Sequence, residues 1–201
     1  MPWNIDLFLL LNAAAEPGSA MLPAVNTLAG GPALLAPVLL ACLWVWGHSD
    51  RRPALLAVAA GLFVGQAVNM LLGMVWYEPR PFMAGVGHTW IAHAADNSFP
   101  SDHATLAWSL GLGLILTGAS RGWGIAACLL GVVAGWARVY LGVHFPVDVL
   151  MSMPAGLLAA AVARLIVPAM RDWAAPPIER LYEAVLGRLP DRLPVPRRMR
   201  P

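Results

Sequence analysis

The sequence contains no lysine, few charges and only two cysteines, and each scarcity excludes a class of protein. All 13 basic residues among the 201 are arginine, and charged residues of both signs make up 12%. That is about half the charged fraction of a typical soluble domain, whereas 59% of the residues are hydrophobic. Cys42 and Cys128 lie inside apolar runs, which argues against a disulfide framework and against a zinc or iron site. We therefore predict an integral membrane protein with no metal, no cofactor and no nucleic-acid partner.

Five apolar segments of the chain are suited to form membrane-spanning helices. They cover, approximately, residues 32–47, 53–77, 101–117, 123–140 and 149–167. The predicted fold is therefore all-α, a polytopic membrane helix bundle with five or six transmembrane helices. We expect residues 1–168 to form this one membrane domain.

Residues 1–31 are less uniformly apolar than these segments, because they include Asp6, Asn12 and Glu16. Their apolar residues at helical spacing are Leu7, Leu10, Leu11 and Ala14. This pattern predicts an amphipathic helix that lies at the membrane interface. A sixth span in this region is the alternative.

The C-terminal segment 169–201 differs in composition, with seven arginines and four acidic residues between positions 170 and 201. Its apolar residues on one helical face are Ile178, Leu181, Tyr182, Val185, Leu186 and Leu189. The pattern predicts an arginine-rich amphipathic tail on an anionic membrane surface. If the five spans alternate, Arg51, Arg52 and Arg121 share its side, which the positive-inside rule makes cytoplasmic. The connections 78–100 and 141–148 then lie on the extracytoplasmic side.

Three short polar segments come to that extracytoplasmic side. They are Glu78-Pro79-Arg80-Pro81-Phe82, Phe99-Pro100-Ser101-Asp102-His103, and the stretch from Arg138 to Asp148. Ser101 follows a proline and precedes a long apolar run, so it is a good N-cap of a helix whose free N–H groups can bind an anion. Arg80 and Arg138 can each donate paired hydrogen bonds to a phosphate. Two histidines, His103 and His144, can supply a nucleophile or base and an acid.

His144 and Asp148 are four residues apart, and Pro146 between them suits the first turn of a helix. In such a helix the carboxylate of Asp148 can reach the His144 ring and fix its tautomer. The alternative is an interfacial pair of Arg138 and Asp148 beside a helix-capping histidine. The convergence of all three segments favours a phosphoryl-transfer site without a metal.

The three segments resemble the signature motifs of the type 2 phosphatidic acid phosphatase family of membrane lipid phosphatases, K-x6-R-P, P-S-G-H and S-R-x5-H-x3-D. The second motif is here Pro100-Ser101-Asp102-His103. The third is Ala137-Arg138, five residues, His144, three residues and Asp148. The phrases YEPRPF, FPSDHAT and RVYLGVHFPVD look most like the bacterial undecaprenyl-diphosphatase branch of the family.

The resemblance implies a role for each matched residue. His144 would attack the terminal phosphorus to form a phosphohistidine while Asp148 orients its ring, and His103 would act first as acid and then as base. The residues implied to bind the phosphate oxygens are Arg80, Ser101, Arg138 and, through its backbone, Asp102. The implied reaction converts undecaprenyl diphosphate to undecaprenyl phosphate and phosphate, without a metal, at the outer face of the bacterial cytoplasmic membrane.

Two other functions remain open at the level of sequence. One is a phosphatase for phosphatidic acid, phosphatidylglycerol phosphate or lipid A. The other, of a different class, is a non-catalytic transporter or binding protein for a lipid phosphate taken from the bilayer.

The sequence departs from the family pattern at three positions, with Gly73 for the lysine, Asp102 for the glycine and Ala137 for the serine. We expect Asp102 either to help cap its helix or to raise the pKa of the neighbouring His103 and keep it a proton donor. We expect structural and not catalytic roles for several other polar residues. Glu78 is expected at the membrane interface or beside Arg80. His88 and His93 are expected in solvent or in loop packing. Gln66 and Asn69 are expected to form hydrogen bonds between helices.

Overall fold

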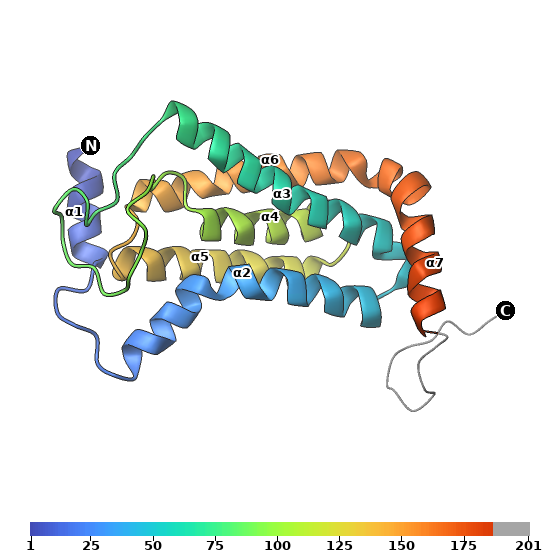
Figure 1. Cartoon of the computed structure of the whole chain (residues 1–201), viewed down its shortest axis with the longest axis horizontal. Helices are drawn as coiled ribbons and strands as arrows, with labels where there is room; N and C mark the ends of the chain where they lie inside the picture. Colours follow the sequence, from blue (N-terminus) through green and yellow to red (C-terminus); the bar gives the residue numbers. More distant parts are fainter. Residues whose placement is uncertain (187–201) are drawn as a thin grey trace.

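The computed structural model describes residues 1–186, and within that range the chain is helical and contains no β-strand (Figure 1). The helices are α1 (Pro2–Leu11), α2 (Met21–Trp46), the 3-10 turn η1 (Ser49–Arg51), α3 (Arg52–Val75), α4 (Asp102–Leu116), α5 (Arg121–Tyr140), α6 (Pro146–Ala169), the π-helical turn η2 (Met170–Ala174) and α7 (Ala175–Leu186). The all-α membrane helix bundle predicted from composition is confirmed.

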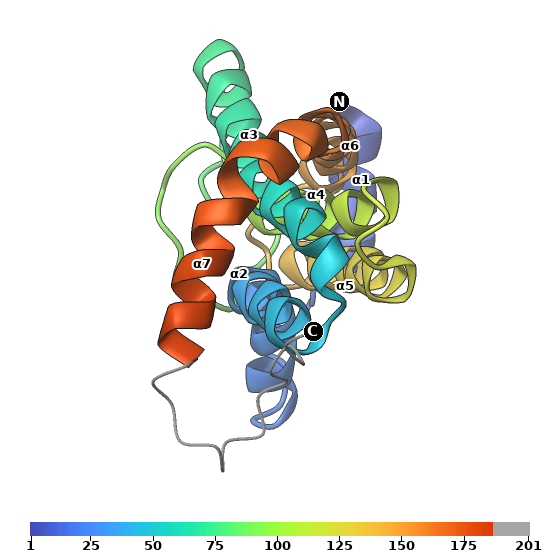
Figure 2. The ribbon, with the colours of Figure 1, turned by 90° about the vertical axis from the view of Figure 1, so that its right-hand side faces the viewer.

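Helix α4 lies at the centre of the bundle and packs against α6, α5, α3 and α2 (Figures 1 and 2). Small residues allow this close approach. A Cβ on Gly111 would lie 2.5 Å from the sulfur of Cys128, and one on Gly156 would lie 2.4 Å from Cβ of Trp108. Such contacts between small residues are how helices associate in lipid, where burial of apolar surface gives no advantage.

Within residues 1–186, four segments are long and apolar enough to cross a membrane: Met21–Trp46, Ser49–Val75, Arg121–Tyr140 and Pro146–Val185. The central helix α4 has 15 residues and is therefore about 22 Å long, shorter than a hydrocarbon core of about 30 Å. The connection 76–101 lies at the N-terminal end of α4, at the same end of the bundle as α1 (Figure 1). That connection and the turn between α5 and α6 hold the polar motifs.

The N-terminal region differs from its prediction at the start of α2. Helix α2 begins at Met21 rather than at residue 32, and Pro32 and Pro37 lie inside it, because neighbouring helices in a membrane tolerate proline. Helix α1 has 10 residues, about 15 Å, which is too short to be the sixth span. Its buried residues are Asn4 and Phe8, whereas Leu10 on the predicted leucine face is 79% exposed.

Helix α1 covers the start of α6. The side chain of Asn4 accepts a hydrogen bond from the backbone N–H of Val147 at 3.1 Å, and the rings of Phe8 and Phe145 meet edge to face at 5.2 Å. Just beyond the helix, Asn12 donates to the carbonyls of His88 and Tyr140. Asn4 in the helix and Asn12 directly after it therefore hold this apolar helix in place.

At the opposite end of the bundle the chain turns at η2, and α7 runs across the ends of the other helices (Figures 1 and 2). The guanidinium of Arg52 lies 5.1 Å from the ring of Trp44 and 4.7 Å from that of Tyr182, which fastens α7 to the bundle. Ile178, Leu181 and Val185 of the predicted apolar face are exposed. The rest of the predicted tail, including Leu189, lies outside the described residues.

Candidate active site

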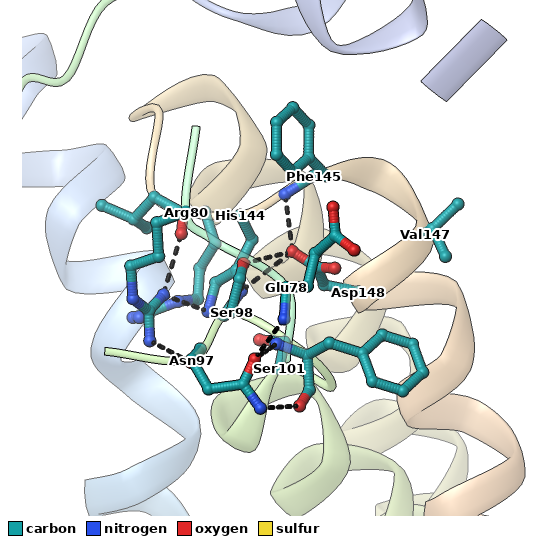
Figure 3. A network of polar contacts seen from close by, with 12 residues as sticks. Glu78, Arg80, Asn97, Ser98, Ser101, His144, Phe145, Val147 and Asp148 are labelled. Atoms are coloured by element: carbon teal, nitrogen blue, oxygen red, sulfur yellow. Dashed lines mark hydrogen bonds and ion pairs between the residues drawn. The ribbon is translucent and has the colours of Figure 1, made fainter. Parts of the chain in front are cut away.

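The structure brings the three motifs together at one end of the bundle. The 76–101 connection, the first turn of α4, the last turn of α5 and the first turn of α6 meet there (Figures 1 and 3). The predicted residues Arg80, Ser101, Arg138, His144 and Asp148 are each no more than 4% exposed. Buried ionisable side chains at the edge of a membrane bundle require a functional or a pairing explanation.

A tight turn at Gly142 presents His144. This glycine has φ +82°, and a Cβ on it would lie 1.9 Å from the carbonyl oxygen of His88, so only glycine fits. Pro146 then opens α6, as predicted from its position. The turn therefore places the imidazole of His144 directly beside the first turn of α6.

The ring of His144 contacts Asp148 both directly and through Ser98 (Figure 3). Its Nδ1 lies 3.2 Å from Oγ of Ser98 and 3.5 Å from the carboxylate of Asp148, and the Ser98 hydroxyl donates to that same carboxylate. Because the hydroxyl proton points to Asp148, its oxygen accepts the Nδ1–H of the ring. The lone pair of His144 is then on Nε2, which lies 3.2 Å from Nη1 of Arg80.

The pKa of His144 is lowered well below its usual 6.5, first by burial and then by the positive charges of Arg138 and Arg80. The ring is therefore neutral at physiological pH. A neutral imidazole whose Nε2 lone pair faces an arginine is suited to attack an anionic phosphorus centre held by that arginine.

Every nitrogen of the Arg80 guanidinium has a protein partner. Its Nε donates to the carboxylate of Asp96 at 2.7 Å, Nη1 to the carbonyl of Val143 at 2.8 Å, and Nη2 to the carbonyl of Asn97 at 3.2 Å. Asp96, and not Glu78, is therefore the carboxylate paired with Arg80, which leaves the interfacial alternative for Glu78. The side chain of Glu78 is 3.4 Å from the indole nitrogen of Trp76.

Arg138 retains donors that the described part of the chain leaves unused. Its buried Nε has no hydrogen-bond partner among residues 1–186. Its Nη2 lies 2.8 Å from Nε2 of His93, so this loop histidine packs against the site instead of lying in solvent. Unpaired buried donors are costly unless a ligand satisfies them, and Arg138 is thus prepared for an anion.

Ser101 precedes α4 as predicted, but its hydroxyl does not cap the helix. The buried Oγ makes no hydrogen bond with any described residue. Its backbone is held instead, since the N–H donates to the carbonyl of Asp148 at 3.1 Å and the carbonyl accepts from Ser152 at 3.0 Å. A fixed backbone with a free hydroxyl at a helix N-terminus is suited to bind an oxyanion.

The side chain of Asp102 turns away from this cradle and does not cap α4. Its carboxylate accepts from the amide of Asn69 on α3 at 2.8 Å, and its carbonyl accepts from Gln66 at 3.2 Å. Asn69 and Gln66 thus bridge helices as expected. Only the backbone of Asp102 is therefore a candidate for phosphate binding.

His103 follows Asp102 in the first turn of α4 and is partly exposed. Arg138 and Arg80 both act on it electrostatically. A partly exposed histidine at the edge of the cradle can exchange protons with a leaving group or a water molecule.

The amide of Asn97 lies where a side chain at position 73, the lysine position of the family motif, would begin. A Cβ on Gly73 would lie only 2.8 Å from Nδ2 of Asn97. That amide donates to the carbonyls of Gly73 and Trp76 at 3.3 and 3.1 Å, and its oxygen accepts the N–H of Glu78 at 2.9 Å. Asn97 therefore fixes the first and second motifs to the end of α3, beside a pocket of about 360 Å³.

Sequence reasoning missed four residues of this site: His93, Asp96, Asn97 and Ser98. All belong to the connection between α3 and α4. Their signal in the sequence was weak, namely polar residues immediately before the second motif. Within residues 1–186, no three His, Cys, Asp or Glu side chains are grouped to hold a metal ion.

Comparison with known proteins gives consistent matches. The sequence profile of the family described as the PAP2 superfamily matches residues 54–172, more than half of the chain. The undecaprenyl-diphosphatase BcrC of Bacillus subtilis (strain 168) is 34% identical over 155 residues, 76% of this chain and 77% of that protein. YbjG of Escherichia coli (strain K12), named provisionally as an undecaprenyl-diphosphatase, is 35% identical over 168 residues, 83% of this chain and 84% of that protein.

A solved structure has the same fold. The crystal structure of Aquifex aeolicus LpxE is similar with a TM-score of 0.65, and the match covers 80% of this chain and 94% of that chain. Because the two sequences are 23% identical, this likeness concerns the arrangement of the helices.

Proposed function

This chain belongs to the PAP2 superfamily, the family that its three motifs resemble, and we propose that it hydrolyses undecaprenyl diphosphate to undecaprenyl phosphate and inorganic phosphate. As a membrane lipid phosphatase of this type, it takes a lipid phosphate from the bilayer. The choice of a prenyl diphosphate is supported by the names of the two relatives that are 34% and 35% identical.

In the proposed first step, Nε2 of His144 attacks the terminal phosphorus. A P–N bond forms, the P–O bond to the bridging oxygen breaks, and His103 protonates that leaving oxygen. Asp148 stabilises the imidazolium that develops, because it accepts from Nδ1 through the Ser98 hydroxyl. The products of this step are undecaprenyl phosphate and a phosphohistidine.

In the proposed second step, His103 is deprotonated and takes a proton from a water molecule. The water oxygen attacks phosphorus, the P–N bond breaks, and inorganic phosphate leaves with His144 neutral again. Charge on the equatorial oxygens is stabilised by Arg138, the Ser101 hydroxyl, backbone N–H groups at the start of α4, and Arg80. Donors fixed in advance contribute most to such a transition state.

One observation carries this proposal: the neutral His144 presents Nε2 to Arg80 while its Nδ1 is held by Ser98 and Asp148. The chain supplies the nucleophile, the acid and the cationic groups, so we propose that the reaction needs no metal. The turn between α2 and α3 and the start of α5 lie at the opposite end of the bundle (Figure 1). These segments hold Arg51, Arg52 and Arg121. By the positive-inside rule that end is cytoplasmic, and the active site would face the outside of the bacterial cytoplasmic membrane.

The test is release of phosphate from undecaprenyl diphosphate by the purified chain in EDTA. Wild type should release phosphate and His144→Ala should not, while both keep the same helix content by circular dichroism. A panel with phosphatidic acid, phosphatidylglycerol phosphate and lipid A measures the preference for the prenyl lipid. Binding of the lipids without release by wild type would contradict the proposal and favour the non-catalytic transporter.

A further inference from the structure

The segment 93–96 contacts both arginines of the phosphate site, although it belongs to none of the three motifs. Asp96 accepts from Nε of Arg80 at 2.7 Å, and Nε2 of His93 lies 2.8 Å from Nη2 of Arg138. The two arginines therefore have partners of different charge. Arg80 is paired with a carboxylate, and Arg138 is paired with an imidazole.

The protonation state of His93 follows from its contacts. Burial is the main cause that lowers its pKa, and the charges of Arg80 and Arg138 lower it further. The hydrogen bond with the Ala94 carbonyl and the Asp96 carboxylate, 4.0 Å from Nδ1, oppose this lowering of the pKa. A neutral ring has one donor and one acceptor nitrogen, and a guanidinium can only donate. Nε2 is therefore the acceptor for Arg138, and Nδ1–H donates to the carbonyl of Ala94 at 3.2 Å.

The same ring is also adjacent to the nucleophile. The ring centroids of His93 and His144 are 6.4 Å apart with an angle of 75° between the planes. The side chain of His93 is 20% exposed. A third histidine thus lies beside the reacting imidazole, on the side of Arg138.

We propose that His93 is a positioning residue for phosphate binding, which fixes the guanidinium of Arg138 by accepting its hydrogen bond without placing a further negative charge beside it. A carboxylate in the same place would fix the arginine equally well but would cancel much of its attraction for an anion. An imidazole accepts without a negative charge. The inference rests on the proposed function only in naming a lipid diphosphate as the substrate.

The experiment compares an isosteric pair at position 93. Orthophosphate is titrated into the full chain in lipid nanodiscs and its binding is followed by ³¹P NMR, for wild type, His93→Ala, His93→Gln and His93→Glu. His93→Gln retains a neutral acceptor and should bind within about threefold of wild type. His93→Ala should bind about tenfold more weakly, the loss of one hydrogen bond to a charged group, and His93→Glu more weakly still.

The matched control is His88→Gln, on the same connection. The ring of His88 stacks on Trp90 at 5.6 Å, and its substitution should leave orthophosphate affinity unchanged. A purely structural role for His93 predicts that Gln and Glu, which have the same shape, behave alike. Equal affinities for that pair, or wild-type affinity in His93→Ala, would overturn the inference.

Turnover gives a second readout. With undecaprenyl diphosphate, His93→Ala should raise KM more than it lowers kcat, because the residue acts through an arginine that binds the phosphate. The orthophosphate titration needs no turnover. Failure of wild type to hydrolyse any lipid phosphate would therefore refute the proposed function and leave the binding test of His93 intact.

Discussion

The hydroxyl of Ser98 is closer to the imidazole of His144 than the carboxylate of Asp148 is, at 3.2 Å against 3.5 Å from Nδ1. The motif pairs the histidine with the aspartate, and in this chain a serine lies between the two. Ser98 is completely buried and donates to Asp148. It thereby fixes which ring nitrogen carries the proton and which one is free to attack.

Ser98→Ala should lower kcat about tenfold while KM changes little. The substitution removes the acceptor for Nδ1–H and leaves a longer direct contact with Asp148, a loss of the size of one buried hydrogen bond. Steady-state kinetics of phosphate release measures it. Ser109→Ala on α4 is the matched control, because the Ser109 hydroxyl is buried and has no hydrogen-bond partner among the described residues. Equal kinetics of the two variants would contradict a role for Ser98.

The lowered pKa of His144 predicts activity that persists into mildly acidic solution. A buried histidine beside two arginines binds a proton less readily than a free one, whose pKa is 6.5. The neutral, nucleophilic form therefore remains populated as the pH falls below 6.5, and it is lost only when the pH passes the lowered value. The acid limb of kcat/KM, which reports the free enzyme, should lie below 6.5. A limb at or above 6.5 would show that His144 is charged in the free enzyme.

The sequence was sufficient to predict the residues whose spacing is local. His144, Pro146 and Asp148 share one turn and the start of one helix, so their contact follows from helical geometry. The convergence of Arg80, Ser101 and Arg138 followed from alternation of the spans across the bilayer. Both predictions needed only the periodicity and the order of the elements.

The partners supplied by the 76–101 connection could not be predicted in the same way. His93 and Arg138 are 45 residues apart in the chain, and their contact depends on the path of an irregular loop with no periodicity to guide a prediction. The early start of α2 was missed for a different reason. Proline usually marks a helix start in water, whereas a membrane bundle accepts Pro32 within the helix.

Gly73→Ala should destabilise the protein although it adds only a methyl group. A Cβ there would lie 2.8 Å from Nδ2 of Asn97, which is held by the carbonyls of Trp76 and Phe99 and cannot move freely. Overpacking of this kind costs about 1–3 kcal/mol, and each kcal/mol lowers Tm by about 2–4 °C in a chain of this size.

A double variant that combines Gly73→Lys with Asn97→Gly tests whether Asn97 takes the place of the family lysine. Removing the amide should let the lysine be accommodated, so the double variant should be more active and melt higher than Gly73→Lys alone. Thermal unfolding followed by circular dichroism, together with phosphate release, measures both. Additive losses in the double variant would show that the two positions are independent.

Asp102→Asn should strengthen substrate binding, because Asp102 places a negative charge where the family pattern has glycine. Its carboxylate acts electrostatically on both His103 and Arg138, and so it weakens the positive field that attracts a diphosphate. Asparagine keeps the shape and an oxygen acceptor for Asn69, which now donates to that carboxylate at 2.8 Å. KM for undecaprenyl diphosphate should fall about twofold to fivefold, the effect of one partly exposed charge, and the fall should diminish at high salt. Asp50→Asn, at the other end of the bundle on η1, is the control for a general change in charge. An increase in KM would instead assign the Asp102 carboxylate a direct role in holding the substrate.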